Sequence, residues 1–154
     1  MYRVAVITLS DKGARGERED VSGQVIEDMV KEAGYKVVSR QLLSDDRQGL
    51  TDALISLCDS NTAELILTTG GTGFSPRDNA PEATLTACER MAPGIAEAMR
   101  MASLQITPRA MLSRAVSGIR KKTLIVNLPG SPKAVKENLS FILPTLEHGI
   151  AILV

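Results

Sequence analysis

Short apolar runs alternate with segments of helical periodicity along most of this chain. The runs at 2–9, 35–43 and 65–69 are rich in β-branched and aliphatic residues, which is typical of buried strands. Between them, apolar residues recur every three or four positions, at 21–33 and again at 50–58. Strands that alternate with helices form a mostly parallel sheet, because each parallel connection needs a crossover. The pattern therefore predicts an α/β fold.

The C-terminal half adds a different feature. Two strand-like runs, 115–119 and 123–127, are separated only by the basic residues 120–122, which predicts a β-hairpin. A hairpin places an antiparallel pair at the edge of the sheet. No repeat, linker or low-complexity tract interrupts the chain. We expect residues 1–154 to form a single doubly wound, three-layer domain, with a mostly parallel sheet and an antiparallel edge hairpin.

Composition argues against several classes of function. Aromatic residues make up 3% of the chain and Trp is absent, which disfavours base-stacking platforms for nucleic acid. No apolar run approaches the roughly 20 residues that span a bilayer. Cys58 and Cys88 lie in no metal-binding or redox motif and fit a reducing cytoplasm. The single histidine, His148, lies in the last predicted helix, so histidine-based nucleophilic catalysis is not expected. We expect a cytoplasmic protein that binds neither nucleic acid nor membranes.

The charge distribution is uneven although the net charge is zero. Residues 98–136 contain eight Lys or Arg and no Asp or Glu. Such a stretch favours an anionic partner. The alternative is that the acidic first part of the chain neutralises it across a solvated surface, and the sequence leaves both interpretations open.

Polar segments follow the predicted strands at their carboxyl ends, where open α/β sheets bind ligands. These segments are Ser10-Asp11, Ser44-Asp45-Asp46, Gly70-Gly71-Thr72-Gly73 with Asp78, and Pro129-Gly130-Ser131. Glycines let backbone N–H groups approach an anion closely. Ser131 also suits the N-cap of the last helix, with Pro132 as its first residue, and a helix N-terminus attracts phosphate.

The glycine segments alone do not identify a nucleotide site. Residues 70–77 lack the Lys-Ser/Thr ending of a P-loop, and no strand-to-helix turn carries a G-x-G-x-x-G. A plain tight turn therefore remains an alternative to a phosphate-binding turn. Thr72 and Arg77 would add donors to a phosphate site.

Two aspartates are candidate magnesium ligands. Asp45 and Asp78 each follow a predicted strand end, so both can face one crevice. Mg²⁺ prefers oxygen ligands and shares them with substrate phosphates. The alternative is that Asp45 or Asp46 caps the following helix, and for Asp46 capping is the preferred interpretation.

Five ordered motifs point to a family. They are Thr68-Thr-Gly-Gly-Thr-Gly-Phe-Ser-Pro-Arg-Asp78, Pro81-Glu-Ala-Thr84, Pro93-Gly94, Ala110-Met-Leu-Ser-Arg114 and Asn127-Leu-Pro-Gly-Ser-Pro132. Together they resemble the molybdopterin adenylyltransferase family, the Mog/MoaB group that also occurs as a domain of gephyrin. The resemblance covers nearly the whole chain.

The resemblance implies a homotrimer that uses Mg²⁺, ATP and molybdopterin. It implies that Asp45 and Asp78 are catalytic and bind the metal, and that Ser113 handles the pterin. Gly70 to Gly73 and Pro129-Gly130-Ser131 would bind phosphate or adenylate. Arg77 and Arg114 are candidate substrate contacts. The product would pass to a molybdenum insertase.

One local departure affects the same site. The family often has Val-Thr before Pro-Glu-Ala-Thr, whereas this chain has Asn79-Ala80. Asn79 or Asp78 could replace the lost threonine as the helix N-cap. A capping role for Asp78 would compete with metal binding. The alternative function is a molybdopterin-binding protein of the same fold without transferase activity. Retention of both aspartates and Ser113 favours the enzyme.

Overall fold

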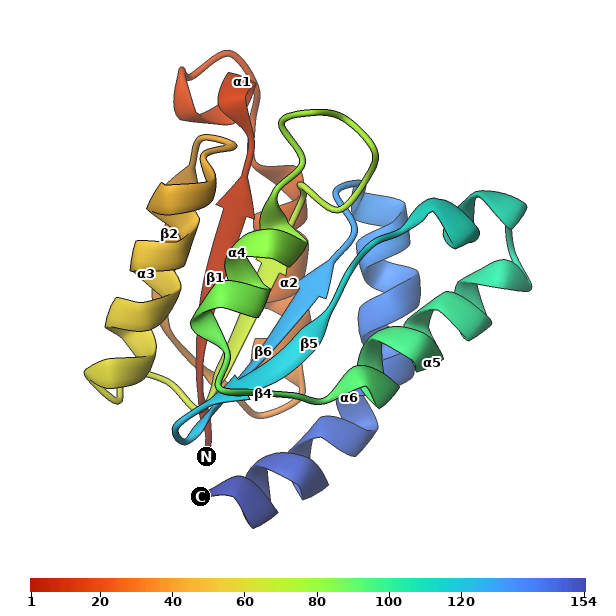
Figure 1. The fold of residues 1–154 in the computed structure, drawn as a ribbon. Coiled ribbons are helices and arrows are strands. Elements are labelled where there is room, and N and C mark those ends of the chain that lie inside the picture. The colour runs from red at the N-terminus through yellow and green to blue at the C-terminus, as the bar shows by residue number, and fades with distance from the viewer.

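In the computed structural model, which describes residues 1–154, one six-stranded sheet lies between two layers of helices (Figure 1). The sheet has the order β2-β1-β3-β6-β5-β4. Neighbouring pairs among β2, β1, β3 and β6 are parallel, whereas β5 runs antiparallel to both β6 and β4. The strands are β1 (Arg3–Leu9), β2 (Lys36–Leu43), β3 (Leu65–Thr69), β4 (Arg90–Met91), β5 (Ser117–Arg120) and β6 (Thr123–Leu128).

The helices divide between the two faces of the sheet. They are α1 (Asp11–Ala14), α2 (Val21–Glu32), α3 (Arg47–Asp59), α4 (Ala80–Ala87), α5 (Pro93–Leu104), the 3₁₀ helix η1 (Pro108–Leu112) and α6 (Pro132–Leu153). One core cluster joins the sheet to α2, α5 and α6, and a second joins its other face to α3 and α4. The doubly wound, three-layer α/β fold is thereby confirmed.

Alternating residues of one strand reach both cores. Val4 and Val6 of β1 belong to the α2–α5–α6 cluster, whereas Ala5 and Ile7 belong to the α3–α4 cluster. All four are fully buried. A strand that is covered on both faces needs apolar residues at every position. This is why β1 and β3 are largely apolar runs in the sequence.

Three local features differ from the sequence expectations. The segment between β1 and α2, for which no helix was predicted, contains the short helix α1, capped by Ser10, whose Oγ accepts the N–H of Gly13 at 3.0 Å. Arg90 and Met91, which follow α4 closely, form the short strand β4, which pairs with β5. The antiparallel edge therefore consists of β5 and β4, and β6 lies inside the sheet between β3 and β5.

Helix α6 continues through Pro144, although proline usually kinks or ends a helix. The ribbon of α6 changes direction between its upper and lower halves (Figure 1). Proline has no N–H, so the carbonyl of Ser140 loses its usual helical donor, and this loss favours bending. None of the helices combines the length and the apolar character needed to cross a membrane.

The topology gathers the carboxyl ends of four parallel strands at one edge. After β1 the chain enters α2 on one face, whereas after β3 it enters α4 on the other. Because β1 and β3 are neighbours, the sheet has its switch point between them. Ligands of open α/β sheets bind in the crevice at such a point.

Candidate active site

A crevice of about 690 Å³ opens at the switch point. The ends of β1 and β3, the N-termini of α2 and α6, and the loops that follow β1, β2 and β3 surround it. Its polar and glycine lining comprises Thr8, Ser10, Asp11, Lys12, Gly13, Arg18, Glu19, Asp20, Ser22, Asp45, Thr69, Gly70, Gly71, Asp78, Gly130 and Ser131. Asp45 and Asp78 are thus brought to the same crevice, as the strand-end argument expected.

Asp11 and Asp45 tie the ends of β1 and β2 together. The N–H of Asp11 donates to Asp45 Oδ2 at 3.1 Å, and the N–H of Asp45 donates to Asp11 Oδ1 at 2.9 Å. Burial raises the pKa of Asp45, and the neighbouring carboxylates of Asp11 and Asp78 raise it further. A cation in the crevice would relieve this repulsion.

Asp78 is free of the helix-capping role that the sequence allowed. Its Oδ2 accepts the N–H of Ser75 at 3.0 Å, within the loop that follows β3. Asn79 occupies the N-cap position of α4 but makes no side-chain capping bond. The N–H of Ala80 donates instead to the carbonyl of Gly71 at 3.0 Å. The expectation that Asn79 or Asp78 caps α4 is therefore wrong. Asp46 does cap its helix, by accepting the N–H of Gly49 at 2.8 Å.

The glycines after β3 hold a backbone conformation that other residues rarely adopt. Gly70 and Gly71 have φ angles of +93° and +71°. A Cβ at Gly70 would lie 2.5 Å from the carbonyl oxygen of Leu9. The N–H groups of Gly71, Thr72 and Gly73 donate to no backbone acceptor. The turn therefore presents free N–H donors of the kind that bind anions.

The turn after β6 complements this loop. Ser131 caps α6 by accepting the N–H of Ala134 at 3.2 Å, and Pro132 is the first helical residue, as expected. The N–H groups of Gly130 and Ser131 donate to no backbone acceptor. Ser22 of α2 donates to the carbonyl of Gly130 at 2.7 Å and so fixes the turn beside the crevice. The N-terminus of α6 adds partial positive charge there.

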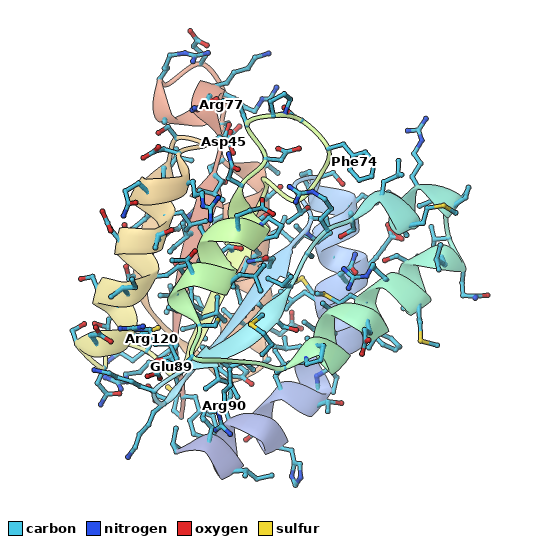
Figure 2. The ribbon with its side chains drawn as sticks, in the orientation of Figure 1. Asp45, Phe74, Arg77, Glu89, Arg90 and Arg120 are labelled. Atoms are coloured by element: carbon cyan, nitrogen blue, oxygen red, sulfur yellow. The ribbon has the colours of Figure 1, made fainter.

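Both candidate substrate arginines already have partners. Arg77 forms a bidentate pair with Asp11, at 3.1 Å through Nε and 2.8 Å through Nη2. The Arg77 guanidinium is the main cause that lowers the pKa of Asp11 to about 2. Figure 2 shows Arg77 and Asp45 together at the carboxyl edge of the sheet. Arg114 pairs with Glu82 and donates to the carbonyls of Gly73 and Asp78, so it holds the loop after β3.

The acid-free segment at 98–136 does not face the crevice as a unit. Arg120 and Lys121 lie at the turn that precedes β6, the opposite end of the sheet, and both pair with Asp59. Figure 2 shows Arg120 far from Asp45. Here the neutralising interpretation is correct, because a hairpin turn lies one strand length from the carboxyl end of β6.

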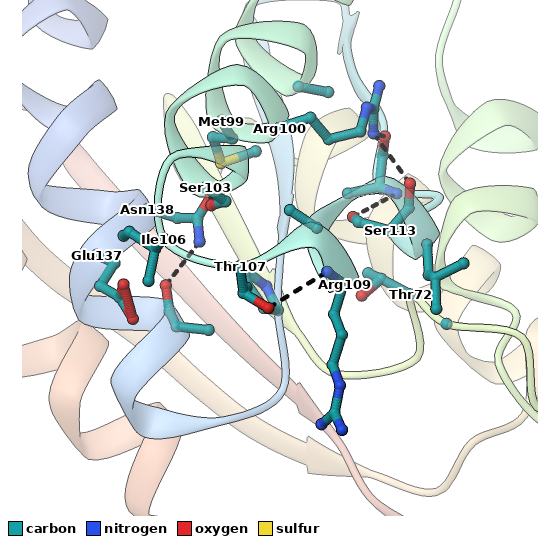
Figure 3. A pocket seen from close by; sticks show the side chains of 17 residues that line it. Thr72, Met99, Arg100, Ser103, Ile106, Thr107, Arg109, Ser113, Glu137 and Asn138 are labelled. Carbon is teal, nitrogen blue, oxygen red and sulfur yellow. Dashed lines mark hydrogen bonds between the residues drawn. The ribbon is translucent and has the colours of Figure 1, made fainter.

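A second hollow of about 290 Å³ lies on the other side of the turns after β3 and β6 (Figure 3). Thr72, Gly73, Ser113 and Pro129, which the sequence grouped with the phosphate site or the pterin, line this hollow and not the crevice. The other lining residues come from α5, η1 and α6 and the segments that adjoin η1; they are Ala96, Met99, Arg100, Ser103, Ile106, Thr107, Arg109, Ala110, Leu112, Ala115, Ala134, Glu137 and Asn138. The segments 70–73 and 129–131 thus form a wall that two cavities share.

Several lining residues were missed by the sequence interpretation. Lys12 and Arg18 are the two cations that line the crevice, and Arg100 and Arg109 are those of the hollow. The loop at 10–20 joins the first strand to its helix, a position that often binds phosphate. That position was a usable signal for Lys12 and Arg18. Nothing local marks Arg100, because its place depends on how α5 packs.

The chain is similar to known proteins over nearly its whole length. Residues 5–148 match the family described as probable molybdopterin binding domain. A Helicobacter pylori protein named molybdopterin adenylyltransferase is 40% identical over 147 residues, covering 94% of this chain and 84% of that protein. The Escherichia coli K12 protein of the same name is 39% identical, covering 89% and 71%.

Solved structures agree with this relationship. The molybdopterin biosynthesis enzyme MoaB from Thermus thermophilus is 44% identical, with a TM-score of 0.92 and coverage of 99% of this chain and 96% of that one. The tungsten cofactor synthesizing protein MoaB from Pyrococcus furiosus is 32% identical, with a TM-score of 0.90 and coverage of 99% and 97%. The chain therefore carries the probable molybdopterin binding domain and belongs to the molybdopterin adenylyltransferase family.

Proposed function

We propose that this protein transfers AMP from ATP to the terminal phosphate of molybdopterin and releases pyrophosphate. Membership of the family supports the coarser statement that it is an enzyme of molybdenum cofactor biosynthesis. The observation that carries the finer proposal is the arrangement of two cavities on either side of the turns at 70–73 and 129–131. One cavity suits the nucleotide, the other suits the pterin, and the reacting phosphates would meet at the wall between them.

The crevice suits a triphosphate. Free N–H groups at Gly71, Gly130 and Ser131, together with the N-terminus of α6, can donate hydrogen bonds to phosphate oxygens. Lys12 and Arg18 add positive charge and take part in no ion pair. Thr69 donates its hydroxyl to the carbonyl of Pro129 and so keeps the two turns together. The ATP phosphates would bind here.

The carboxylates of the crevice fit a magnesium ion. No group of three or more His, Cys, Asp or Glu side chains lies close enough to hold a metal by itself. Mg²⁺ is commonly held by one or two carboxylates together with substrate phosphates, and Asp45 and Asp78 supply two. Bound there, Mg²⁺ would neutralise charge on the phosphates of ATP.

The reaction is an in-line displacement. An oxygen of the molybdopterin phosphate forms a bond to the α-phosphorus of ATP, and the bond from that phosphorus to the α,β-bridging oxygen breaks. The electron pair leaves with pyrophosphate. The attacking phosphate is already ionised, so catalysis rests on alignment and charge neutralisation. The free N–H groups of the wall would bind the developing charge, and Arg77, whose guanidinium pairs with Asp11 of the crevice, would exchange that carboxylate for a phosphate oxygen.

The hollow suits the pterin. It combines apolar side chains such as Met99 and Leu112 with a few polar groups, which is typical of sites for planar organic ligands. Ser113, the expected pterin contact, lines it, and its Oγ accepts the N–H of Ala115 at 3.3 Å, so its hydroxyl hydrogen is free to donate. The pterin would therefore bind beside η1.

Pyrophosphate release tests the proposal. Purified protein incubated with molybdopterin, ATP and Mg²⁺ should release pyrophosphate, and Asp78→Asn should abolish release while nucleotide affinity falls less than about tenfold. Asn can still accept the N–H of Ser75, so the loop should keep its shape. Asp46→Asn is the matched control, because Asp46 caps α3 and asparagine caps equally well.

Each other result of this experiment has a clear meaning. Full activity of the Asp78→Asn variant would remove the metal role of that carboxylate. Tight molybdopterin binding by the wild-type protein without pyrophosphate release would instead identify a binding protein of the same fold.

A further inference from the structure

Glu137 is the one carboxylate that lines the hollow beside η1. It lies in the second turn of α6 and is partly buried. Its backbone carbonyl accepts a hydrogen bond from Ser140, whereas its carboxylate has no hydrogen-bond or ion-pair partner in the protein. Figure 3 shows Glu137 on the α6 side of the hollow and Arg109 on the η1 side. The hollow therefore offers an unused pair of acceptor oxygens.

The other polar side chains near Glu137 are already engaged. Asn138 donates to the carbonyl of Ala134 at 2.7 Å, and its Oδ1 accepts the hydroxyl of Ser103 at 3.1 Å. Arg100 donates to the carbonyls of Ser113 and Ala115. These bonds fix the shape of the hollow. Among its side chains, only Glu137 can accept two parallel N–H bonds without giving up a bond inside the protein.

Two parallel N–H donors are what the pyrimidine edge of a pterin presents. Its ring N3–H and its 2-amino group lie side by side, at the spacing of the two oxygens of a carboxylate. A lumazine carries a 2-oxo group where the pterin has the amine, so its edge places an acceptor against that carboxylate. Charge-assisted bidentate hydrogen bonds are strong and specific in geometry. A single carboxylate can therefore distinguish a pterin from a lumazine.

We propose that Glu137 is the specificity-determining residue for the 2-amino group of the pterin. The inference rests on the proposed function, because it takes the hollow as the pterin site. Asn138, Ser103 and Arg100 fix the shape of the hollow, and the Glu137 carboxylate accepts the N–H groups at the edge of the ring. The phosphate chemistry at Asp45 and Asp78 does not depend on this contact.

Binding of two fluorescent probes tests the inference. The affinities of wild-type protein and Glu137→Gln for 6-hydroxymethylpterin and 6-hydroxymethyllumazine are measured by fluorescence titration at neutral pH. Wild-type protein should prefer the pterin by about tenfold or more, as expected for a charged hydrogen bond against an unpaired group. Glu137→Gln should lose about tenfold in pterin affinity and retain less than about threefold preference, because its amide can face the 2-oxo group as a donor.

Glu147→Gln is the matched control. It lies on the same helix, outside the hollow, so it should bind both probes as the wild-type protein does. Wild-type protein that does not bind the pterin more tightly than the lumazine would overturn the inference. An unchanged preference in Glu137→Gln would overturn it equally.

The test separates this inference from the proposed function. If the protein prefers the pterin through Glu137 but releases no pyrophosphate, the role of Glu137 in pterin recognition is supported and adenylyl transfer is contradicted. If the protein releases pyrophosphate but shows no such preference, adenylyl transfer is supported and the role of Glu137 is contradicted.

Discussion

Arg114 shows how a single residue can support the site without touching a substrate. Its guanidinium makes four hydrogen bonds, to the carbonyls of Gly73 and Asp78 and to both oxygens of Glu82. Only a planar fork of donors can satisfy this set. In the sequence Arg114 was a candidate substrate contact, and that role stays a prediction. The structure adds a positioning role at the loop between the two cavities.

Arg114→Ala should lower the free energy of unfolding by about 1–3 kcal/mol, because Glu82 and two carbonyls lose a charged donor. Arg114→Lys should recover little of this loss, because a lysine ammonium cannot reproduce the planar set of guanidinium N–H donors. Urea denaturation measures both. Arg109→Ala is the control, since the Arg109 side chain has no partner, and it should leave stability within about 0.5 kcal/mol. Equal stability of Arg114→Ala and wild-type protein would contradict the positioning role.

The ion pair of Asp11 and Arg77 gives stability a defined acid dependence. The pKa of Asp11 falls from 3.8 to about 2 in the folded protein. A lowered pKa means that the pair stabilises the fold fully above the unfolded value and loses that contribution as pH falls toward 2. The difference in unfolding free energy between wild-type protein and Asp11→Asn should therefore stay constant down to about pH 4 and shrink below it. Urea denaturation at a series of pH values checks this. A difference that is the same at pH 3 and pH 6 would argue against the pair.

At the scale of elements, the turn after β3 depends on glycine whereas α6 does not. Gly70 has a positive φ and meets the backbone of β1, because the loop must pass close to Leu9 to enter α4. Gly149 lies in α6, and a Cβ there would meet open space. The same residue type therefore has opposite consequences in two elements.

Gly70→Ala should destabilise the protein by about 2–4 kcal/mol, through backbone strain and contact with the Leu9 carbonyl. Gly149→Ala should instead stabilise it by roughly 0.5–1 kcal/mol, because alanine is the better helix former. Thermal or urea unfolding of the two variants measures the loss of stability in Gly70→Ala and the gain in Gly149→Ala. A tolerated Gly70→Ala would mean that the loop can move away from β1.

At the scale of the whole molecule, the helices beside the hollow leave apolar side chains exposed. Met101 of α5 is 70% exposed, Ile106 in the turn after α5 is 56% exposed, and Met111 of η1 is 65% exposed. Exposed apolar groups of this kind often mark contacts between subunits. We propose that this face lies between subunits of a homotrimer, the assembly that the family resemblance implied.

Sedimentation equilibrium should give three times the mass of one chain, and the double variant Met101→Glu with Met111→Glu should shift the protein toward monomer, because two charges would be buried in the interface. Leu85→Glu is the control, since Leu85 is exposed on α4 in the opposite helical layer. A wild-type monomer would exclude the trimer, and a double variant that stays trimeric would move the interface to another face.

Apart from α1 and β4, the order of strands and helices along the chain was predictable, because each element depends on neighbouring residues. The apolar runs of β1 and β3, the cap at Ser131 and the glycines at 70 and 71 all act within a few positions of the chain. The meeting of Asp45 and Asp78 followed from the rule that parallel strands end at one edge. These parts of the fold and of the candidate site follow from the sequence alone.

Only the tertiary structure decided which groups are free and which are engaged. The Asp78 side chain does not cap α4, and Arg77 and Arg114 form ion pairs with acidic side chains. Arg120 lies at the far end of the sheet. The division into crevice and hollow also depends on how α5, η1 and α6 pack against two turns. Such facts depend on contacts between residues distant in the chain, which local patterns do not encode.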